Sequence, residues 1–333
     1  MVTWKLLSRD ESLECWNERL FRFEDFTYSQ SFEWGEYRSN FGQRPYRWIA
    51  TNLQGEAVTM CQGLLRSYPG KTGLLWVAGG PVGDLSSCGK DLMHTLQEST
   101  EMKRLYCRIS PMRHYSAYDA LILRGLGWKR PSASILSGMT MHYDSASDEQ
   151  ARVSFSTKNW RHNLRRSEKY GLSTSLWENP EIDTIYQLYT SMQDYKQLSQ
   201  QYSKLEIEKI FNGFGKSIVL YRCDDESGNP VALRGCVILG KKAWDLFAAT
   251  SVKGRKLYAS YALFWRLMKH CHENGVVIYD MSGIDPFANP GVYDFKKGTG
   301  AKPVEYLGEW EWASSEWLRW GANWMIGRRA GRP

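Results

Sequence analysis

The same order of expected elements occurs twice in this chain, and this repetition limits the possible folds more than any other feature. A strand, a turn, two further strands, a helix and a last strand follow one another over residues 46–110 and again over residues 217–283. The two copies agree in order and length but not in their residues. A duplicated unit of strands and helices explains the agreement, so we expect an α/β (α+β) protein.

Runs of apolar and β-branched residues predict the strands, and Gly and Pro mark the turns between them. In the first copy the strands are expected at 46–51, 57–67, 73–78 and 105–109, with a helix from 86 to 103. In the second copy they are expected at 217–222, 231–239, 243–249 and 276–281, with a helix over 258–274.

Length and composition fit this division. The 333 residues suit two domains of roughly 100–200 residues each. A net charge of +7 favours an anionic partner such as nucleic acid, a nucleotide-linked substrate or an acidic membrane surface. The seven cysteines include no Cys-x-x-Cys pair, which argues against a disulfide framework or a zinc site and favours reduced thiols in a cytoplasm. No signal peptide and no stretch of membrane-span length is expected.

Several common catalytic motifs are missing from the sequence. There is no Walker-type phosphate loop, no Gly-x-Gly-x-x-Gly after a strand and no Gly-x-Ser-x-Gly. Of the histidines, only His270 and His272 are close in sequence, and residues two apart on a helix point in different directions. We therefore expect no metal site.

Clustered cations mark two stretches of the second half. Residues 156–172 predict a helix whose Arg161 and Arg165 form one positive stripe, which fits either a solvated face or contacts with nucleic-acid phosphates. Residues 251–259 lack the glycine spacing of an acyl-coenzyme A loop. Three cations in this loop still suit an anion at the start of the next helix: Lys253, Arg255 and Lys256.

Two features lie near the C-terminal end of the sequence. Residues 291–300 follow the last strand of the second copy, and we expect a loop whose mobile backbone holds Lys296 and Lys297 where an anion approaches. Taken alone, such a stretch also fits an ordinary surface turn. Residues 314–327 carry Trp317, Trp320 and Trp324 and predict an amphipathic helix that docks on a core in preference to a membrane surface.

Five short stretches of the sequence, taken in their order along the chain, carry a resemblance to a known family. They are Phe32–Arg38, Gly79–Val82, Asn163–Gly171, Tyr279–Ile284 and Gly291–Gly300, the last of which contains Phe295-Lys296. In this order and spacing, most of the chain resembles the Fem family of aminoacyltransferases, which build interpeptide bridges on peptidoglycan precursors.

The resemblance implies two tandem acetyltransferase-like (GNAT-like) domains with mixed sheets flanked by helices and a cleft between the domains. Residues 1–145 would form the first domain, completed by the C-terminal segment 313–333, and residues 146–312 the second. The family uses aminoacyl-tRNA as co-substrate and no other cofactor. We expect a monomer without stable membrane insertion.

The resemblance also implies roles for particular residues. Lys296, beside Phe295, would stabilise charge during acyl transfer. Arg38 would contact the sugar-nucleotide or pyrophosphate part of the acceptor. Trp34 and Tyr37 share its helix face, and Glu309 roughly matches an acidic position near the cleft. The phosphates of tRNA would be held by Arg161, Arg165, Arg166, Lys253, Arg255 and Lys256.

The acceptor is left open by two departures from the family pattern. Ser110-Pro111 stands where an acid often precedes the proline, and Leu198 stands where an arginine is expected four residues before Tyr202. Compact relatives also decorate antibiotics, so the acceptor is the amine of a peptidoglycan precursor or of a small peptide. The alternatives are an acyl-coenzyme A-dependent N-acyltransferase on the same fold and a non-catalytic RNA-binding module.

Overall fold

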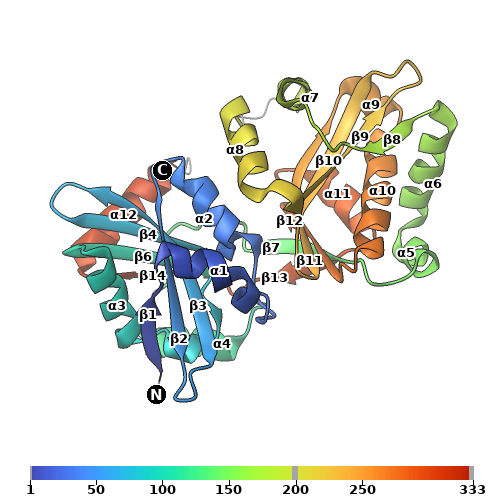
Figure 1. The fold of residues 1–333 in the computed structure, drawn as a ribbon. Coiled ribbons are helices and arrows are strands. Elements are labelled where there is room, and N and C mark those ends of the chain that lie inside the picture. Colours follow the sequence, from blue (N-terminus) through green and yellow to red (C-terminus); the bar gives the residue numbers. More distant parts are fainter. Residues whose placement is uncertain (1, 197–201, 330–333) are drawn as a thin grey trace. The chain divides into compact units, whose positions relative to one another are not determined.

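The computed structural model describes residues 2–196 and 202–329, and the chain forms two compact units (Figure 1). The first unit comprises Met1–Gly138 with Glu305–Pro333, and the second comprises Met139–Val304. Both boundaries lie a few residues before those expected from the sequence. The reason is that residues 139–144 pair within the second sheet, whereas residues 310–313 pair within the first.

The first sheet has the order β1–β2–β3–β4–β6–β14, and β5 attaches to β3. Its strands are β1 (Thr3–Leu6), β2 (Arg44–Thr51), β3 (Ala57–Tyr68), β4 (Thr72–Gly79), β5 (Val82–Gly83), β6 (Arg104–Pro111) and β14 (Trp310–Ala313). Neighbours are antiparallel except β4 and β6, because the chain crosses between them through α3 (Lys90–Thr100).

Helices cover both faces of this sheet. They are α1 (Arg9–Leu20), α2 (Phe32–Ser39), α3, α4 (Ala117–Gly125) and α12 (Glu316–Arg329). On one face α3 and α4 bury a core that includes Trp48, Leu96 and Trp128. On the other face α2 packs on β2 and β3, and α12 packs on β6 and β14. Serine side chains cap the N-termini of α1 and α2.

The second sheet has the order β13–β7–β12–β11–β10–β9–β8. Its strands are β7 (Met139–Asp144), β8 (Ser173–Leu176), β9 (Ile218–Asp224), β10 (Pro230–Leu239), β11 (Lys242–Thr250), β12 (Ile278–Gly283) and β13 (Lys302–Glu305). As in the first sheet, the parallel pair, β11 and β12, is joined through a helix, α10 (Ala259–Glu273). The repeated order of elements expected from the sequence is thus confirmed.

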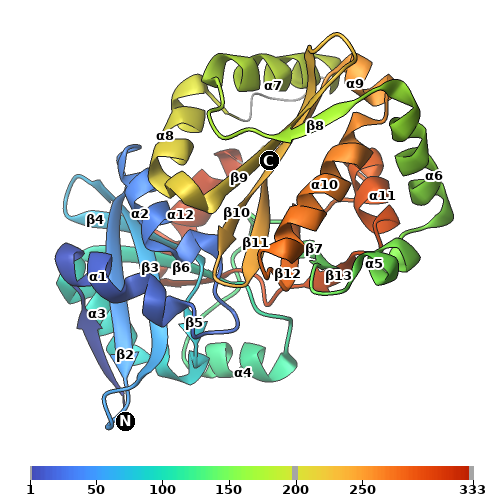
Figure 2. The ribbon, with the colours of Figure 1, turned by 45° about the vertical axis from the view of Figure 1, so that its right-hand side comes forward.

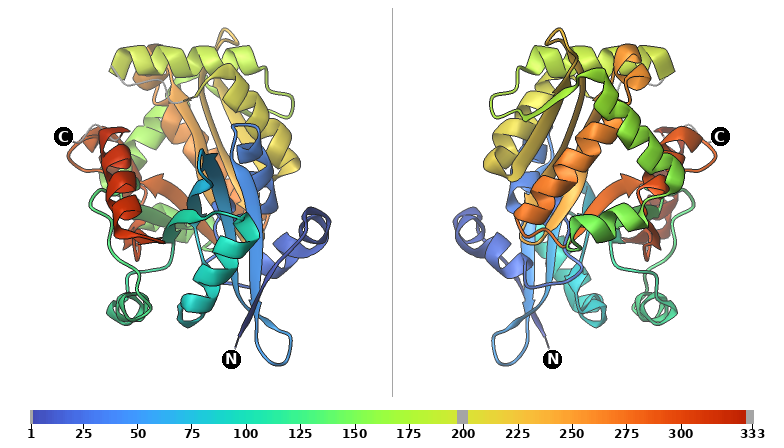
Figure 3. Two further views of the ribbon diagram at one scale, coloured as in Figure 1. Left: turned by 90° about the vertical axis from the view of Figure 1, so that its left-hand side faces the viewer. Right: turned by 90° about the vertical axis from the view of Figure 1, so that its right-hand side faces the viewer.

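Helices also flank the second sheet, with α6, α10 and α11 on one side and α8 on the other (Figure 2). The helices of this unit are α5 (Glu149–Phe155), α6 (Lys158–Ser167), α7 (Ile182–Lys196), α8 (Lys204–Phe214), α9 (Val252–Lys256), α10 and α11 (Pro290–Gly298). Trp160 of α6, Phe264 of α10 and Tyr279 of β12 belong to its core. Figure 3 shows α10 running alongside the strands.

Two expectations from the sequence are wrong at the C-terminal end. Residues 290–298 form a helix and not a mobile loop, because Pro290 starts a helical turn. Residues 316–329 do form a helix, but its tryptophans do not dock on the core: Trp317, Trp320 and Trp324 are 85%, 68% and 55% exposed. The buried side is instead that of Ala322 and Asn323, whose small side chains allow α12 to approach the sheet.

Within residues 2–196 and 202–329, no helix is both long and apolar enough to cross a membrane. All seven cysteines fall in these ranges and are free thiols, and all but Cys15 are buried. The same ranges hold no cluster of three His, Cys, Asp or Glu side chains that could bind a metal ion.

Candidate active site

Lys296 lies in the last turn of α11 and is buried, with 6% of its surface exposed. Its Nζ donates to the backbone carbonyls of Ser282, at 3.1 Å, and Gly283, at 2.8 Å. These carbonyls belong to the end of β12, where Ser282 has a left-handed φ of 64°. Left-handed backbone at a serine is strained, and such strain clusters at functional sites. Lys297 is exposed, so the structure separates the two lysines that the sequence places side by side.

The end of β12 is also where the second sheet opens. The parallel register of β11 and β12 runs from Lys242 opposite Ile278 to Trp244 opposite Asp280 and stops there. At the same level of β11, a β-bulge interrupts the pairing of β10 with β11, between Gly235 and Cys236. Bulges are frequent next to active sites, and diverging strands leave backbone groups available to a ligand. The corresponding strands of the first unit, β4 and β6, stay paired to their ends at Gly79 and Pro111.

A buried charged cluster surrounds this opening. Arg234 of β10 donates to Oδ2 of Asp245 at 2.7 Å, and the Tyr279 hydroxyl donates to Oδ1 of Asp245 at 2.7 Å. Burial lowers the pKa of Lys296 below its ordinary value of 10.5, and the positive charge of Arg234 adds to this effect. The carboxylates of Asp245 and Asp280 oppose it. The Lys296 ammonium is therefore a fixed, poorly hydrated positive charge at the end of a strand, where it can stabilise an oxyanion.

Phe295 precedes this lysine in the chain and packs on aromatic side chains of the second unit. Its ring contacts Tyr261 at 5.1 Å and Phe264 at 5.9 Å between centroids. The guanidinium of Arg234 lies 5.5 Å from the ring centroid of Phe295. Phe295 thus anchors α11 on the aromatic core next to the charged cluster, which is a positioning contact.

The cations expected to hold tRNA are in different surroundings. Arg161 of α6 donates to the backbone carbonyls of Val153 and Ser156, whereas Arg165 is exposed. Arg166 stacks on the ring of Tyr258 at 4.4 Å. Tyr258 follows α9, so this contact joins the two expected basic stretches in one unit.

The second basic stretch is a short helix, α9, and not a loop. It begins after Ser251, whose side chain accepts a hydrogen bond from the Gly254 amide. Lys253 forms an ion pair with Asp225, and this contact holds the pKa of the aspartate below its ordinary value. Lys256 is exposed, and Arg255 is partly exposed.

In the first unit, Trp34, Tyr37 and Arg38 come together on α2 as expected. The Arg38 guanidinium lies 5.6 Å from the Trp34 ring and 5.8 Å from the Tyr37 ring. Its Nε donates to the Gln43 side chain at 2.7 Å. The aromatic rings and Gln43 thus hold the guanidinium in place.

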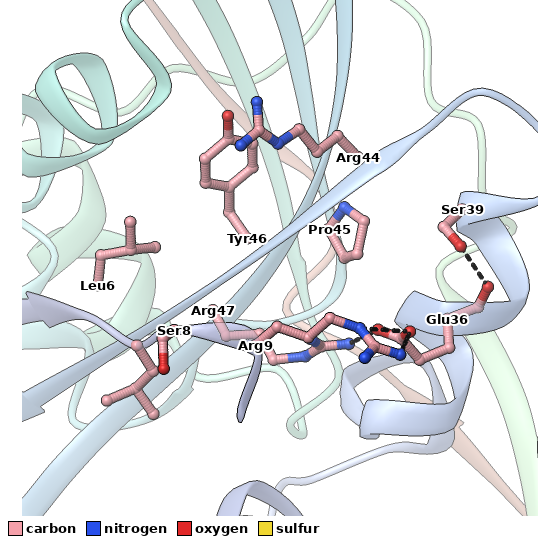
Figure 4. A pocket seen from close by; sticks show the side chains of 10 residues that line it. Leu6, Ser8, Arg9, Glu36, Ser39, Arg44, Pro45, Tyr46 and Arg47 are labelled. Carbon is pink, nitrogen blue, oxygen red and sulfur yellow. Dashed lines mark hydrogen bonds and ion pairs between the residues drawn. The ribbon is translucent and has the colours of Figure 1, made fainter. Parts of the chain in front are cut away.

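A pocket of about 430 Å³ lies on another side of α2 (Figure 4). It is lined by Arg9, Arg44 and Arg47, and Glu36 pairs with Arg9 at 2.7 Å and with Arg47 at 3.1 Å. Arg44 extends over the Tyr46 ring at 5.0 Å. No sequence motif marks this pocket, because its residues come from β1, α1, α2 and β2.

Glu309 has all of its close partners within the first unit. It is 4% exposed, and its Oε1 accepts the backbone amides of Ile135 at 2.7 Å and Leu136 at 2.6 Å. Its Oε2 lies 2.6 Å from Nη2 of Arg108. These contacts give Glu309 a structural role, because it binds two backbone amides and neutralises a buried arginine. Its place near a substrate stays a prediction. Leu198, one of the two departures from the family pattern, falls outside the described residues.

The paired mixed sheets place the protein in the class of tandem acetyltransferase-like folds, and comparisons with known proteins support this. The crystal structure of FemX superposes with a TM-score of 0.81 at 16% identity, covering 96% of this chain and 99% of that one. A tandem GNAT protein from the clavulanic acid biosynthesis pathway gives a TM-score of 0.56 at 11% identity, covering 95% and 99%.

A third structure is the C-terminal domain of a putative lysylphosphatidylglycerol synthetase from Agrobacterium fabrum, with a TM-score of 0.57 at 14% identity and coverage of 96% and 98%. At these identities the likeness establishes the fold. No curated protein matches the chain in sequence.

Residues 215–323 match the FemAB family. The resemblance to the Fem family seen in the sequence is thus confirmed over this segment. At the level of the family, the match supports an aminoacyltransferase. The matched segment contains β9 to β12 and α11. It therefore includes Lys296 and the charged cluster of Arg234, Asp245 and Tyr279.

Proposed function

We propose that this protein transfers an amino acid from aminoacyl-tRNA to an amine of a peptide-type acceptor and forms an amide bond. The observation that carries the proposal is the buried Lys296 ammonium at the point where β11 and β12 part. The FemAB match over the same segment supports this class of reaction.

In this reaction the acceptor amine attacks the ester carbonyl that links the amino acid to the tRNA. A new C–N bond forms, the C–O bond to the ribose breaks, and the amine proton passes to the ribose oxygen that leaves. The oxyanion that develops on the carbonyl needs a fixed positive charge within about 3 Å. Lys296 supplies this charge, and its burial strengthens the interaction because little water screens it.

The cations of α6 and α9 would bind the phosphates of the tRNA. Arg165 and Lys256 are exposed and available for such contacts. The cluster of Trp34, Tyr37 and Arg38 would bind the acceptor, either a peptidoglycan precursor or a small peptide. Neighbouring aromatic rings and a guanidinium suit a planar or anionic group.

The two neighbouring lysines provide the test. Labelled aminoacyl-tRNAs are incubated with the protein and with candidate acceptors, and the amide product is measured. Lys296→Ala should lower the rate at least about 100-fold, the order seen when an oxyanion donor is removed. Lys297→Ala should leave it within about twofold, because Lys297 is exposed and lies over the Tyr293 ring at 5.9 Å. Equal losses in both variants, or loss only in Lys297→Ala, would contradict the proposal.

A second candidate is an acyl-coenzyme A-dependent N-acyltransferase, which the divergence of β11 and β12 also favours. The same assay with acyl-coenzyme A as donor separates the two activities. Product from acyl-coenzyme A and none from any charged tRNA would select this candidate. RNA binding without turnover from either donor would select a non-catalytic module.

A further inference from the structure

Helix α12 turns three tryptophans towards solvent. Trp317, Trp320 and Trp324, at 85%, 68% and 55% exposure, are spaced so that they share one side of the helix. We call this side the tryptophan face. In Figure 3, α12 (red) lies at the surface of the first unit. Exposed large apolar side chains gathered on one face mark an interaction site.

The tryptophan face is not needed to hold α12 in place. On the opposite side Asn323 donates to Oε2 of Glu311 at 2.7 Å, and Arg319 donates to Oε1 of Glu311 at 3.1 Å. Lys129 pairs with Glu316 at 2.6 Å. The helix is thus fixed to the first unit by its polar contacts and by Ala322, and the three rings remain free for a partner.

Positive charge accompanies the three rings. Arg328 lies on the tryptophan face and stacks over Trp324 at 4.3 Å. The sequence then continues with Arg329 and Arg332, and no acidic residue occurs over 317–333. Such a face suits a partner that offers both apolar groups and negative charge.

We propose that the tryptophan face binds the surface of a membrane that contains anionic lipids. Tryptophan rings favour the interface between headgroups and acyl chains, where the ring is apolar and the indole N–H is hydrated. Amphipathic helices with tryptophan and arginine lie in this interface without spanning the bilayer. This inference goes beyond the proposed function and does not depend on it.

Two other partners fit the face less well. A second copy of the chain, packed by a two-fold axis, would bring identical arginines together. A nucleic acid would need a row of cations along its backbone, whereas among the described side chains of this face Arg328 alone is a cation.

Vesicle flotation tests the proposal with the full chain. The vesicles consist of phosphatidylcholine alone or of an equal mixture with phosphatidylglycerol. The variant combines Trp317→Ala, Trp320→Ala and Trp324→Ala. The matched control combines Leu13→Ala, Leu53→Ala and Phe287→Ala, three side chains that are 61%, 81% and 93% exposed elsewhere on the chain.

The wild type and the control should float with the mixed vesicles, and the tryptophan variant should bind at least tenfold more weakly while keeping the wild-type melting temperature. Arg328→Gln should weaken binding to the mixed vesicles about fivefold, the equivalent of roughly 1 kcal/mol for one cation near an anionic surface. It should not change binding to phosphatidylcholine.

Three results would overturn the proposal. They are equal binding by the tryptophan variant and the control, absence of flotation together with a dimer that the tryptophan variant abolishes, and absence of flotation together with RNA binding that it abolishes.

Discussion

At the scale of single residues, the chemistry depends on how one ammonium is held. Lys296 and Lys297 are adjacent, but burial and two carbonyl partners distinguish the first. Asp245 accepts hydrogen bonds from Arg234 and Tyr279, and its negative charge keeps a proton on Lys296 that burial would otherwise help to remove. A charge without such a partner would be costly in this position.

This balance predicts the pH dependence of the reaction. If the charged form of Lys296 is required, kcat/KM should fall as the pH rises through its lowered pKa, below the ordinary 10.5 of lysine. Asp245→Asn removes a charge that raises this pKa, so the fall should occur at a lower pH still. Initial rates of amide formation, corrected for spontaneous hydrolysis of the ester, measure the profile.

The control for this prediction is Asp294→Asn, because Asp294 is exposed on the same helix as Lys296. Its profile should coincide with that of the wild type. A profile of Asp245→Asn that is unchanged, or displaced to higher pH, would show that Asp245 does not set the protonation of Lys296. Circular dichroism checks that the variant is folded.

At the scale of elements, α11 depends on a close approach to α6. A Cβ atom on Gly298 would lie 2.9 Å from Cδ1 of Trp160, and the Thr157 amide donates to the Gly298 carbonyl at 2.8 Å. The start of the same helix is open, since a Cβ on Gly291 would have nothing within 4 Å. The C-terminal turn that carries Lys296 is therefore the part fixed by packing.

Alanine at these two glycines should change the stability differently. Gly298→Ala should lower the free energy of unfolding by about 1–3 kcal/mol, because the new methyl group displaces Trp160 or α11. It should lower activity as well, since Lys296 moves with the helix. Gly291→Ala should be neutral or should stabilise by up to about 1 kcal/mol. Urea unfolding measures the free energy of unfolding of both variants. Equal changes in the two variants would show that the contact of α11 with α6 is not tight.

Helix α6 allows a similar comparison for tRNA binding. Arg165→Ala should weaken binding and reduce the slope of log K against log salt by roughly 0.7–0.9, as for one lost phosphate contact. Arg161→Ala should mainly lower stability, because its guanidinium is bound to the carbonyls of Val153 and Ser156. Arg22→Ala, in the first unit, is the control and should change neither. Filter binding at several salt concentrations gives the slopes, and an unchanged slope for Arg165→Ala would exclude a phosphate contact.

The sequence could predict these elements better than their surroundings. The repeated order of strands and helices follows from local periodicity, as does the helix α6 expected within residues 156–172. The helix at 290–298 was missed because Pro290 and Gly298 look like turn residues, although they start and end a short helix. The spacing of the tryptophans correctly places them on one face of α12, but spacing alone does not tell which face meets the protein. The pocket at Arg44 combines distant segments, which no local pattern reveals.

At the scale of the whole molecule, the two units share the order of their central strands but differ where the parallel strands end. The second unit has the opening between β11 and β12, whereas the first keeps β4 and β6 paired to their ends. Each final parallel strand is flanked by an antiparallel strand, β14 in the first unit and β7 in the second. Because β14 follows the second unit in sequence, the first unit is completed only when the chain returns to it.

This return has a consequence for folding. Without residues 305–333, Arg108 would lose the carboxylate of Glu309 and the Tyr106 hydroxyl would lose Glu311, its acceptor at 2.7 Å. Breaking one buried ion pair by removing a partner costs about 3–5 kcal/mol, a large part of the stability of a domain. Fragment 1–138 should therefore not unfold cooperatively, whereas fragment 139–304 should.

Joining the separated pieces should restore the first unit. The Tyr306 amide donates to the Gly138 carbonyl at 2.9 Å, so a short glycine linker can connect residue 138 to residue 305. The joined chain should show a single cooperative transition in urea by circular dichroism. The same chain with Glu309→Gln should be less stable by several kcal/mol, since a neutral amide leaves the Arg108 charge buried and unpaired. Cooperative unfolding of 1–138 alone, at the midpoint of the joined chain, would show instead that β14 and α12 are accessories to a unit that is complete without them.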